Sequence, residues 1–155
     1  MQETQQPKPK KPARYSWAEV WTAVLTKPNV ATFSEILNDP QATLQRALIW
    51  VYLGGLAASG ALMISLISDP ALIEMFSQSP EFAGMDVEAA LRGSLLLAVP
   101  IASLFALAIF AGLIAIMHFL ARQLTLGSDA KYSELAYTIG AIFAPINIIS
   151  IFLLL

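Results

Sequence analysis

The sequence contains no cysteine and a single histidine, His118. Without cysteine the chain has no disulfide, no thiol nucleophile and no thiolate ligand for a metal or cluster. One histidine excludes a metal site built from a pair of histidines within one chain. The sequence therefore gives little support to catalysis, and we expect no catalytic residue, no metal ligand and no cofactor.

Charged residues are also scarce, at 13% of the sequence against 57% hydrophobic residues. The net charge of −2 averages a basic N-terminal region with an acidic loop, so it describes neither part of the chain. No cluster of basic residues is long enough to suggest a groove for nucleic acid, and we expect no nucleic-acid partner.

Three long apolar stretches without Asp, Glu, Lys or Arg dominate the sequence, at about residues 47–68, 93–120 and 135–155. Each passes the roughly 18 to 20 residues that a helix needs to cross about 30 Å of hydrocarbon. A soluble protein of this length would have too little polar surface to cover three such helices. The sequence predicts an all-α, polytopic transmembrane helical bundle, with the lipid bilayer as its first partner.

Basic residues are distributed unevenly around these stretches, and short loops rich in Lys and Arg stay in the cytoplasm. Six of the nine precede the first stretch: Lys8, Lys10, Lys11, Arg14, Lys27 and Arg46. Only Arg92 lies between the first and second stretches, and Arg122 and Lys131 lie between the second and third. We expect a cytoplasmic N-terminus and an outer loop at residues 69–92.

The chain before the first span divides into two parts. Residues 1–15 form a basic, proline-rich tail that we expect to be disordered, and residues 16–38 are expected to form short cytoplasmic helices. Ser16 and Glu19 have the spacing of a capping box at a helix start. The following residues Trp17, Val20, Trp21, Val24 and Leu25 share one apolar helix face. That amphipathic helix either lies in the headgroup plane as an interfacial anchor or packs this face against the bundle.

The link into the first span has two further start signals. Thr32 and Glu35 repeat the capping-box spacing and predict a short helix with Phe33 facing inward. Asp39 followed by Pro40 predicts the cap and first turn of a helix that continues into the first span.

Small residues recur at four-residue spacing inside the predicted spans. The pairs are Gly55 with Ser59, Ala108 with Gly112, and Gly140 with Ala144. Such spacing lets helix backbones approach closely, within one chain or between copies in a homo-oligomer.

Two prolines interrupt the predicted spans, Pro100 in the second and Pro145 in the third. Each removes a backbone hydrogen bond, so we expect helix kinks at both. Asn147 follows Pro145 by two residues, and its side chain can bond the carbonyl that the proline leaves free or a neighbouring helix.

The link between the second and third spans, residues 126–137 (LGSDAKYSELAY), followed by Pro145, resembles the Yip family of small polytopic membrane proteins. The segment that leads into the first span is similar to that of the prokaryotic members, in Trp21, Lys27-Pro28, Thr32-Phe33, Ile36-Leu37 and Asp39-Pro40. The resemblance covers about residues 17–155. It implies a prokaryotic cell membrane and a Yip-like transmembrane domain over residues 39–155.

Two departures from the family pattern limit what the resemblance implies. Yip-family domains usually have five spans, so we expect the domain to be incomplete at its C-terminus. The Asp-Leu-aromatic-Gly-Pro motif of the eukaryotic members is missing, so binding of Rab GTPases does not carry over. The resemblance then implies a non-enzymatic membrane protein, of a family involved elsewhere in vesicle trafficking and membrane shaping.

The function that we expect is therefore a non-enzymatic scaffold that organises the membrane through helix packing and cytoplasmic contacts. The candidate interface residues are Trp17, Trp21 and Phe33 near the N-terminus and Tyr132, Glu134 and Tyr137 at the link before the third span.

The alternative is a small-solute transporter or permease subunit. In that case Pro100, Pro145 and Asn147 would line a polar path near the middle of the membrane. A membrane enzyme is a third class, for which only His118, Arg122 and Glu134 offer ionisable groups near one surface.

Overall fold

The computed structural model describes residues 14–124 and 131–154, with side chains as far as Ile151. Every regular element in this part of the chain is helical, which confirms the all-α prediction. The elements are α1 (Trp17–Thr26), α2 (Val30–Leu37), α3 (Leu44–Ile67), α4 (Pro70–Ser77), the short 3-10 helix η1 (Pro80–Phe82), α5 (Val87–Leu124) and α6 (Tyr132–Leu154).

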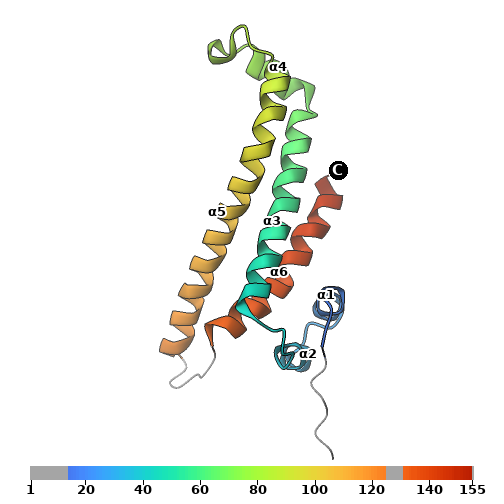
Figure 1. Ribbon diagram of the computed structural model, residues 1–155, viewed down its shortest axis with the longest axis vertical. Coiled ribbons are helices and arrows are strands. Elements are labelled where there is room, and N and C mark those ends of the chain that lie inside the picture. The colour runs from blue at the N-terminus through green and yellow to red at the C-terminus, as the bar shows by residue number, and fades with distance from the viewer. Residues whose placement is uncertain (1–13, 125–130, 155) are drawn as a thin grey trace, which may run out of the picture.

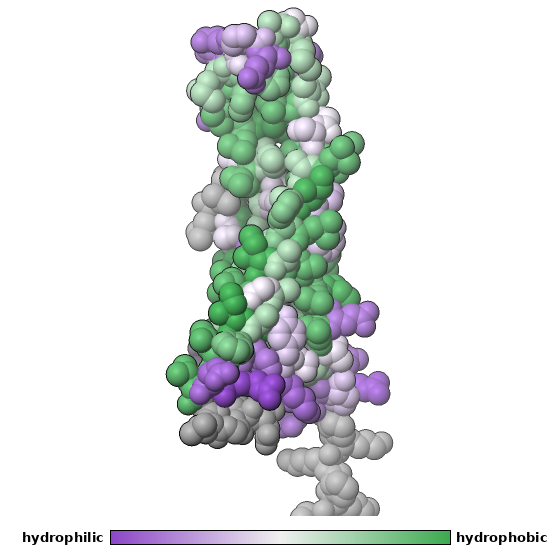
Figure 2. Space-filling view, turned by 90° about the vertical axis from the view of Figure 1, so that its left-hand side faces the viewer, coloured by the Kyte–Doolittle hydropathy of each residue, from purple (hydrophilic) through white to green (hydrophobic). Residues whose placement is uncertain are grey.

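Three of these helices are long and apolar enough to cross a membrane, over Leu44–Ile67, Val87–Leu124 and Tyr132–Ile151. They run along the long axis of the molecule, whereas α4 lies at one end and α1 and α2 lie near the other (Figure 1). Hydrophilic residues gather at the two ends and hydrophobic residues cover the length between them (Figure 2). This is the arrangement of a multi-pass membrane protein.

The central helix is α3, which packs against both α5 and α6. Its contacts depend on small residues. A Cβ added to Gly54 would lie 3.3 Å from Cα of Ala144 on α6, and one added to Gly55 would lie 3.5 Å from Cα of Ser103 on α5. A Cβ on Gly140 of α6 would lie 3.3 Å from Cβ of Ala47. Backbones therefore approach closely on both sides of α3.

The three predicted small-residue pairs lie at different places in the bundle. Gly55 and Ser59 lie at the contact between α3 and α5, and Gly140 and Ala144 lie at the contact between α3 and α6. At Gly112 an added Cβ would meet no atom within 4 Å. Two pairs thus serve packing within the chain, and the remaining pair leaves a small-residue stripe on the outside of α5.

A polar contact joins α3 and α5 in the middle of their interface. The hydroxyl oxygens of Ser59 and Ser103 lie 3.2 Å apart. Ser59 also donates to the carbonyl of Gly55 at 2.6 Å, and the fully buried Ser103 donates to that of Val99 at 2.7 Å. Both hydroxyls are therefore satisfied without ionisable neighbours, as a polar group inside a membrane requires.

Two predicted helix starts are wrong. Helix α2 is capped by Asn29, whose side chain accepts from the backbone N–H of Thr32 at 3.0 Å. Helix α3 begins at Leu44 after the cap residue Thr43, and Asp39 and Pro40 lie in a turn before it. Oδ1 of Asp39 accepts from the backbone N–H of Gln41 at 2.9 Å within this turn, and Oδ2 binds Tyr15 and Arg46, so Asp39 stabilises the turn and no helix begins at Pro40.

Both prolines lie inside helices, Pro100 in α5 and Pro145 in α6. The kink at each stays a prediction. Asn147 does not bond the carbonyl four residues before Pro145, which is that of Ala141. Its side-chain amide donates instead to the carbonyl of Phe143, at 2.8 Å. That bond lies within α6, so the predicted role of Asn147 is wrong.

Gly140→Val tests the close approach of α6 to α3, with Gly112→Val as the matched control. The Gly140 variant should lose about 1 to 3 kcal/mol of stability, because the added atoms meet the backbone of Ala47. The Gly112 variant should unfold at nearly the parent denaturant concentration. Denaturant titration in micelles, followed by circular dichroism, measures both; equal losses would contradict the packing.

Candidate functional site

Helices α1 and α2 lie beside one end of the bundle and across its long axis. Figure 1 shows both nearly end-on, whereas the three long helices run vertically. Val20 and Val24 of α1 are buried against Trp50 of α3 and Tyr137 of α6. The apolar face of α1 therefore packs on the bundle, which was one of the two alternatives for this helix.

Four aromatic side chains from three helices meet at this contact, and we call them the aromatic junction: Trp17, Trp21, Trp50 and Tyr137. The ring of Trp50 lies at its centre, with centroid distances of 6.0 Å to Trp17, 5.9 Å to Trp21 and 5.1 Å to Tyr137. The two α1 rings meet Trp50 edge-on, an orientation that aromatic pairs favour. Trp50 and Tyr137 are fully buried, while Trp17 remains 39% exposed.

A buried ion pair fixes the chain on either side of α1 and α2, and we call it the Arg46 clamp: Tyr15, Asp39 and Arg46. The guanidinium of Arg46 donates to Oδ2 of Asp39 at 3.3 Å and to the backbone carbonyl of Tyr15 at 2.8 Å. The same Asp39 oxygen accepts from the backbone N–H of Tyr15 at 3.1 Å. The clamp thus joins the residues before α1, the turn after α2 and the first turn of α3.

The clamp also contacts the aromatic junction. The guanidinium carbon of Arg46 lies 4.8 Å above the ring of Trp50, within range of a cation–π interaction. Arg46 and Asp39 are both buried, with exposures of 7% and 4%. Such a pair is expensive to break, because a partner left alone is an uncompensated buried charge.

The start of α1 is stabilised by the predicted capping box. The backbone N–H of Ser16 donates to Oε2 of Glu19 at 2.7 Å, and the N–H of Glu19 donates to the Ser16 hydroxyl at 3.3 Å. The bond from the Ser16 backbone is the main reason why the pKa of Glu19 is lowered. One residue earlier, the Tyr15 hydroxyl donates to Glu35 of α2 at 2.9 Å, and this bond raises the pKa of Tyr15.

The predicted interface residues do not form one site. Trp17, Trp21 and Tyr137 belong to the aromatic junction, and Phe33 packs against the same core cluster. The hydroxyl of Tyr132 donates to the carbonyl of Ala111 at 3.1 Å, so this residue joins α6 to α5. Glu134 forms an ion pair with Lys131 at 3.7 Å, at the start of α6.

Two of the three ionisable residues considered for a membrane enzyme, His118 and Glu134, contact other residues. The ring of His118 meets that of Tyr132 edge-on at 6.0 Å, and Glu134 pairs with Lys131. Within residues 14–124 and 131–154, no group of three or more His, Asp or Glu residues is placed to hold a metal ion.

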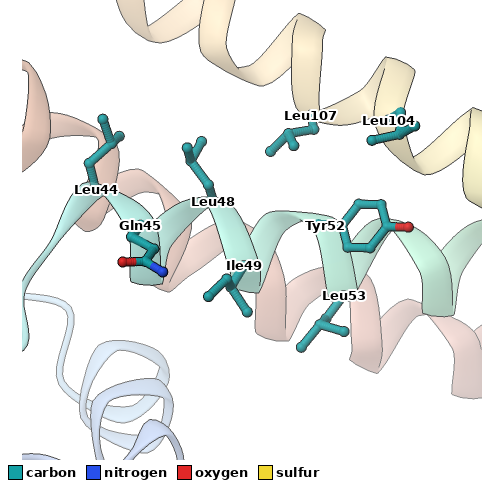
Figure 3. Close-up of a pocket in the computed structure, with 8 residues that line it drawn as sticks. All are labelled: Leu44, Gln45, Leu48, Ile49, Tyr52, Leu53, Leu104 and Leu107. Carbon is teal, nitrogen blue, oxygen red and sulfur yellow. The ribbon is translucent and has the colours of Figure 1, made fainter.

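An apolar groove of about 480 Å³ runs along α3 beside α5 (Figure 3). Leu44, Leu48 and Ile49 line it from α3, and Leu107 lines it from α5. The only side-chain polar groups among its eight lining residues are the amide of Gln45 and the hydroxyl of Tyr52. Pro100, Pro145 and Asn147 do not line it, so it is not the polar path expected of a transporter.

Sequence reasoning missed Tyr15, Asp39, Arg46 and Trp50 as members of one site. From the sequence, Arg46 indicates topology, and Asp39 is interpreted as a helix cap and as part of the Yip-like segment. One signal was available in the sequence, because Arg46 and Trp50 lie four residues apart and such residues are neighbours on a helix surface. The pairing of Arg46 with Asp39 and Tyr15 depends on how the chain folds back, which no local pattern specifies.

Comparison of the chain with protein families, with curated proteins and with solved structures finds no match. The resemblance to the Yip family therefore rests on short sequence motifs alone. Part of the most specific motif, residues 126–130, lies outside the described residues.

Arg46→Gln tests the clamp, with Arg92→Gln as the control. Arg46 pairs with Asp39 in a buried position, whereas Arg92 pairs with Glu88 at the surface. Arg46→Gln should cost about 3 to 5 kcal/mol, because Asp39 is left buried without a counter-charge. Arg92→Gln should cost about 0 to 1 kcal/mol.

Denaturant titration in micelles measures both losses. Chymotryptic cleavage after Trp21, whose ring packs against Trp50, shows whether α1 has come away from the bundle. Equal stability of the two variants would show that the clamp does not hold the N-terminal helices.

Proposed function

We propose that this protein is a non-enzymatic, Yip-like membrane scaffold in which the spans hold two short helices flat at the cytoplasmic membrane surface. The observation that carries the proposal is the position of α1, docked across the bundle axis. The Arg46 clamp joins Tyr15, before α1, to the first turn of α3, and the aromatic junction packs α1 on α3 and α6.

Apolar side chains that the bundle does not bury support a contact between these helices and lipid. Trp17 and Leu25 of α1 are 39% and 41% exposed, and Val30 of α2 is 86% exposed. Tryptophan favours the membrane interface because its ring is apolar and its N–H is polar. A helix that lies in the interface with such side chains occupies area in one leaflet only. Unequal area in the two leaflets favours curvature.

The Yip-like assignment is part of the proposal and is supported by the motif residues before the third span and by those around α1 and α2. In the orientation that the basic residues favour, α1 and α2 lie on the cytoplasmic side, which carries more anionic lipid. Residues 1–13 of the predicted basic tail lie outside the described residues; at an anionic surface, each Lys or Arg of that sequence would add on the order of 1 kcal/mol of attraction.

Vesicle shape tests the scaffold. The full chain, reconstituted at rising protein density in vesicles of phosphatidylcholine with phosphatidylglycerol, should reduce vesicle diameter or draw out tubules in electron cryomicroscopy. The double variant Leu25→Ser/Val30→Ser should lose most of this effect, since both side chains are exposed and polar replacements weaken insertion.

Met75→Ser is the matched control, because Met75 is 57% exposed on α4 at the opposite end of the bundle. This variant should act as the parent does. Vesicles of unchanged diameter at every protein density would contradict the scaffold. Protein-dependent release of a small entrapped solute would favour the transporter alternative instead.

A further inference from the structure

The aromatic junction and Arg46 contain buried polar atoms that lack hydrogen-bond partners. Across the described side chains, four buried side-chain nitrogen or oxygen atoms are in this state: Trp21 Nε1, Arg46 Nε, Trp50 Nε1 and Tyr137 Oη. One comes from α1, two from α3 and one from α6. All four lie where α1 covers the spans.

These atoms make the packed arrangement less stable than its contact area implies. Each is a hydrogen-bond donor, and a buried donor without an acceptor destabilises the state that contains it. A few such atoms occur in most native structures, but their concentration at a single helix contact requires an explanation.

The α1 side of this contact can separate without leaving a buried charge unpaired. Tyr15 contributes its backbone N–H and carbonyl to the clamp, whereas the ion pair between Arg46 and Asp39 lies on the α3 side of the turn. If α1 moved away, Arg46 and Asp39 would keep each other as partners. Pro28 lies between α1 and α2, where a change of direction breaks no helix.

We propose that α1 is a lid over Trp50 and Tyr137 that opens at the membrane surface. In the closed state the rings of Trp17 and Trp21 cover Trp50. In the open state the indole N–H groups and the Tyr137 hydroxyl gain acceptors from water and from headgroup oxygens, which are abundant at that depth. The lid rests on the proposed function, which places α1 at that surface, and it makes the scaffold switchable.

The absence of cysteine allows a single thiol to report the opening. Val24→Cys places the thiol on the face of α1 that packs on the bundle, where Val24 is 3% exposed. The rate of its reaction with a membrane-impermeant maleimide, in nanodiscs of phosphatidylcholine with phosphatidylglycerol, then follows the open population. Thr26→Cys, in an exposed position at the end of α1, gives the unprotected rate.

Two substitutions should shift the rate in opposite directions. Tyr137→Phe removes one unpaired donor from the closed state and should slow labelling of the Val24→Cys protein by several-fold to about tenfold. Tyr15→Phe removes the hydrogen bond from Tyr15, two residues before α1, to Glu35 of α2 and should speed labelling.

Val51→Cys is the control for general loosening of the spans. Val51 is fully buried and adjacent to Trp50, but packs against Phe110 and Ile114 of α5. Its labelling should not change with Tyr137→Phe. If labelling of the Val51→Cys protein does change, Tyr137→Phe has disturbed the spans, and the test of the lid then depends on Tyr15→Phe.

The lid is overturned if labelling of the Val24→Cys protein is unchanged by these substitutions or no faster than that of the Val51→Cys protein. If the Val24→Cys protein reacts as fast as the Thr26→Cys protein, α1 is not docked at all. That result would contradict the docked position of α1, on which the proposed function depends, and not the opening step alone.

Discussion

The contact between Arg46 and its three neighbours determines how the N-terminal helices sit on the bundle. A guanidinium near the start of a long apolar helix needs a counter-charge and acceptors for its N–H groups. Asp39 supplies the charge, the Tyr15 carbonyl supplies a second acceptor, and Trp50 supplies a ring face. Meeting these needs brings together residues 31 positions apart in the chain. With the chain held at Tyr15 and at Asp39, α1 and α2 lie across the helix that bears Arg46 in the closed state.

The position of α3 has a different origin. Inside lipid, the surroundings of a helix are as apolar as a neighbouring helix, so hydrophobic burial does not drive helices together. Their packing depends instead on the close approach of their backbones. Gly54, Gly55 and Gly140 allow it, and the paired hydroxyls of Ser59 and Ser103 add a polar contact between α3 and α5. Because α3 contacts both other spans and also bears Arg46 and Trp50, the position of the N-terminal helices is tied to the packing of the spans. In the proposed scaffold, this connection would set the position of α1 and α2 in the closed state.

The parts of the fold that depend on local pattern could be predicted from the sequence. Three apolar stretches became three long helices, and the spacing of Ser16 and Glu19 gave the capping box. The apolar face of α1 was also visible, but the sequence could not say whether it meets protein or lipid. Its contact with Trp50 and Tyr137 joins segments far apart in sequence.

Two of the three errors, those at Asp39 and Asn147, have a common cause. Asp39 before Pro40 has the pattern of a helix cap, yet its carboxylate pairs with Arg46 and the Tyr15 backbone. Asn147 was assigned to a carbonyl near Pro145, yet it bonds that of Phe143. In each case the side chain had more than one acceptor or donor within reach. The choice between them depends on the packed structure.

The orientation of α1 relative to the spans is the central claim, and the three tryptophans measure it directly. Two lie in α1 and one lies in α3. Solid-state NMR of ¹⁵N-tryptophan protein in aligned bilayers reads the direction of each backbone N–H against the membrane normal. The structure predicts one signal from a helix along the normal, from Trp50, and two from a helix in the membrane plane, from Trp17 and Trp21. Signals of Trp17 and Trp21 that match that of Trp50, or that are averaged by free tumbling, would contradict it.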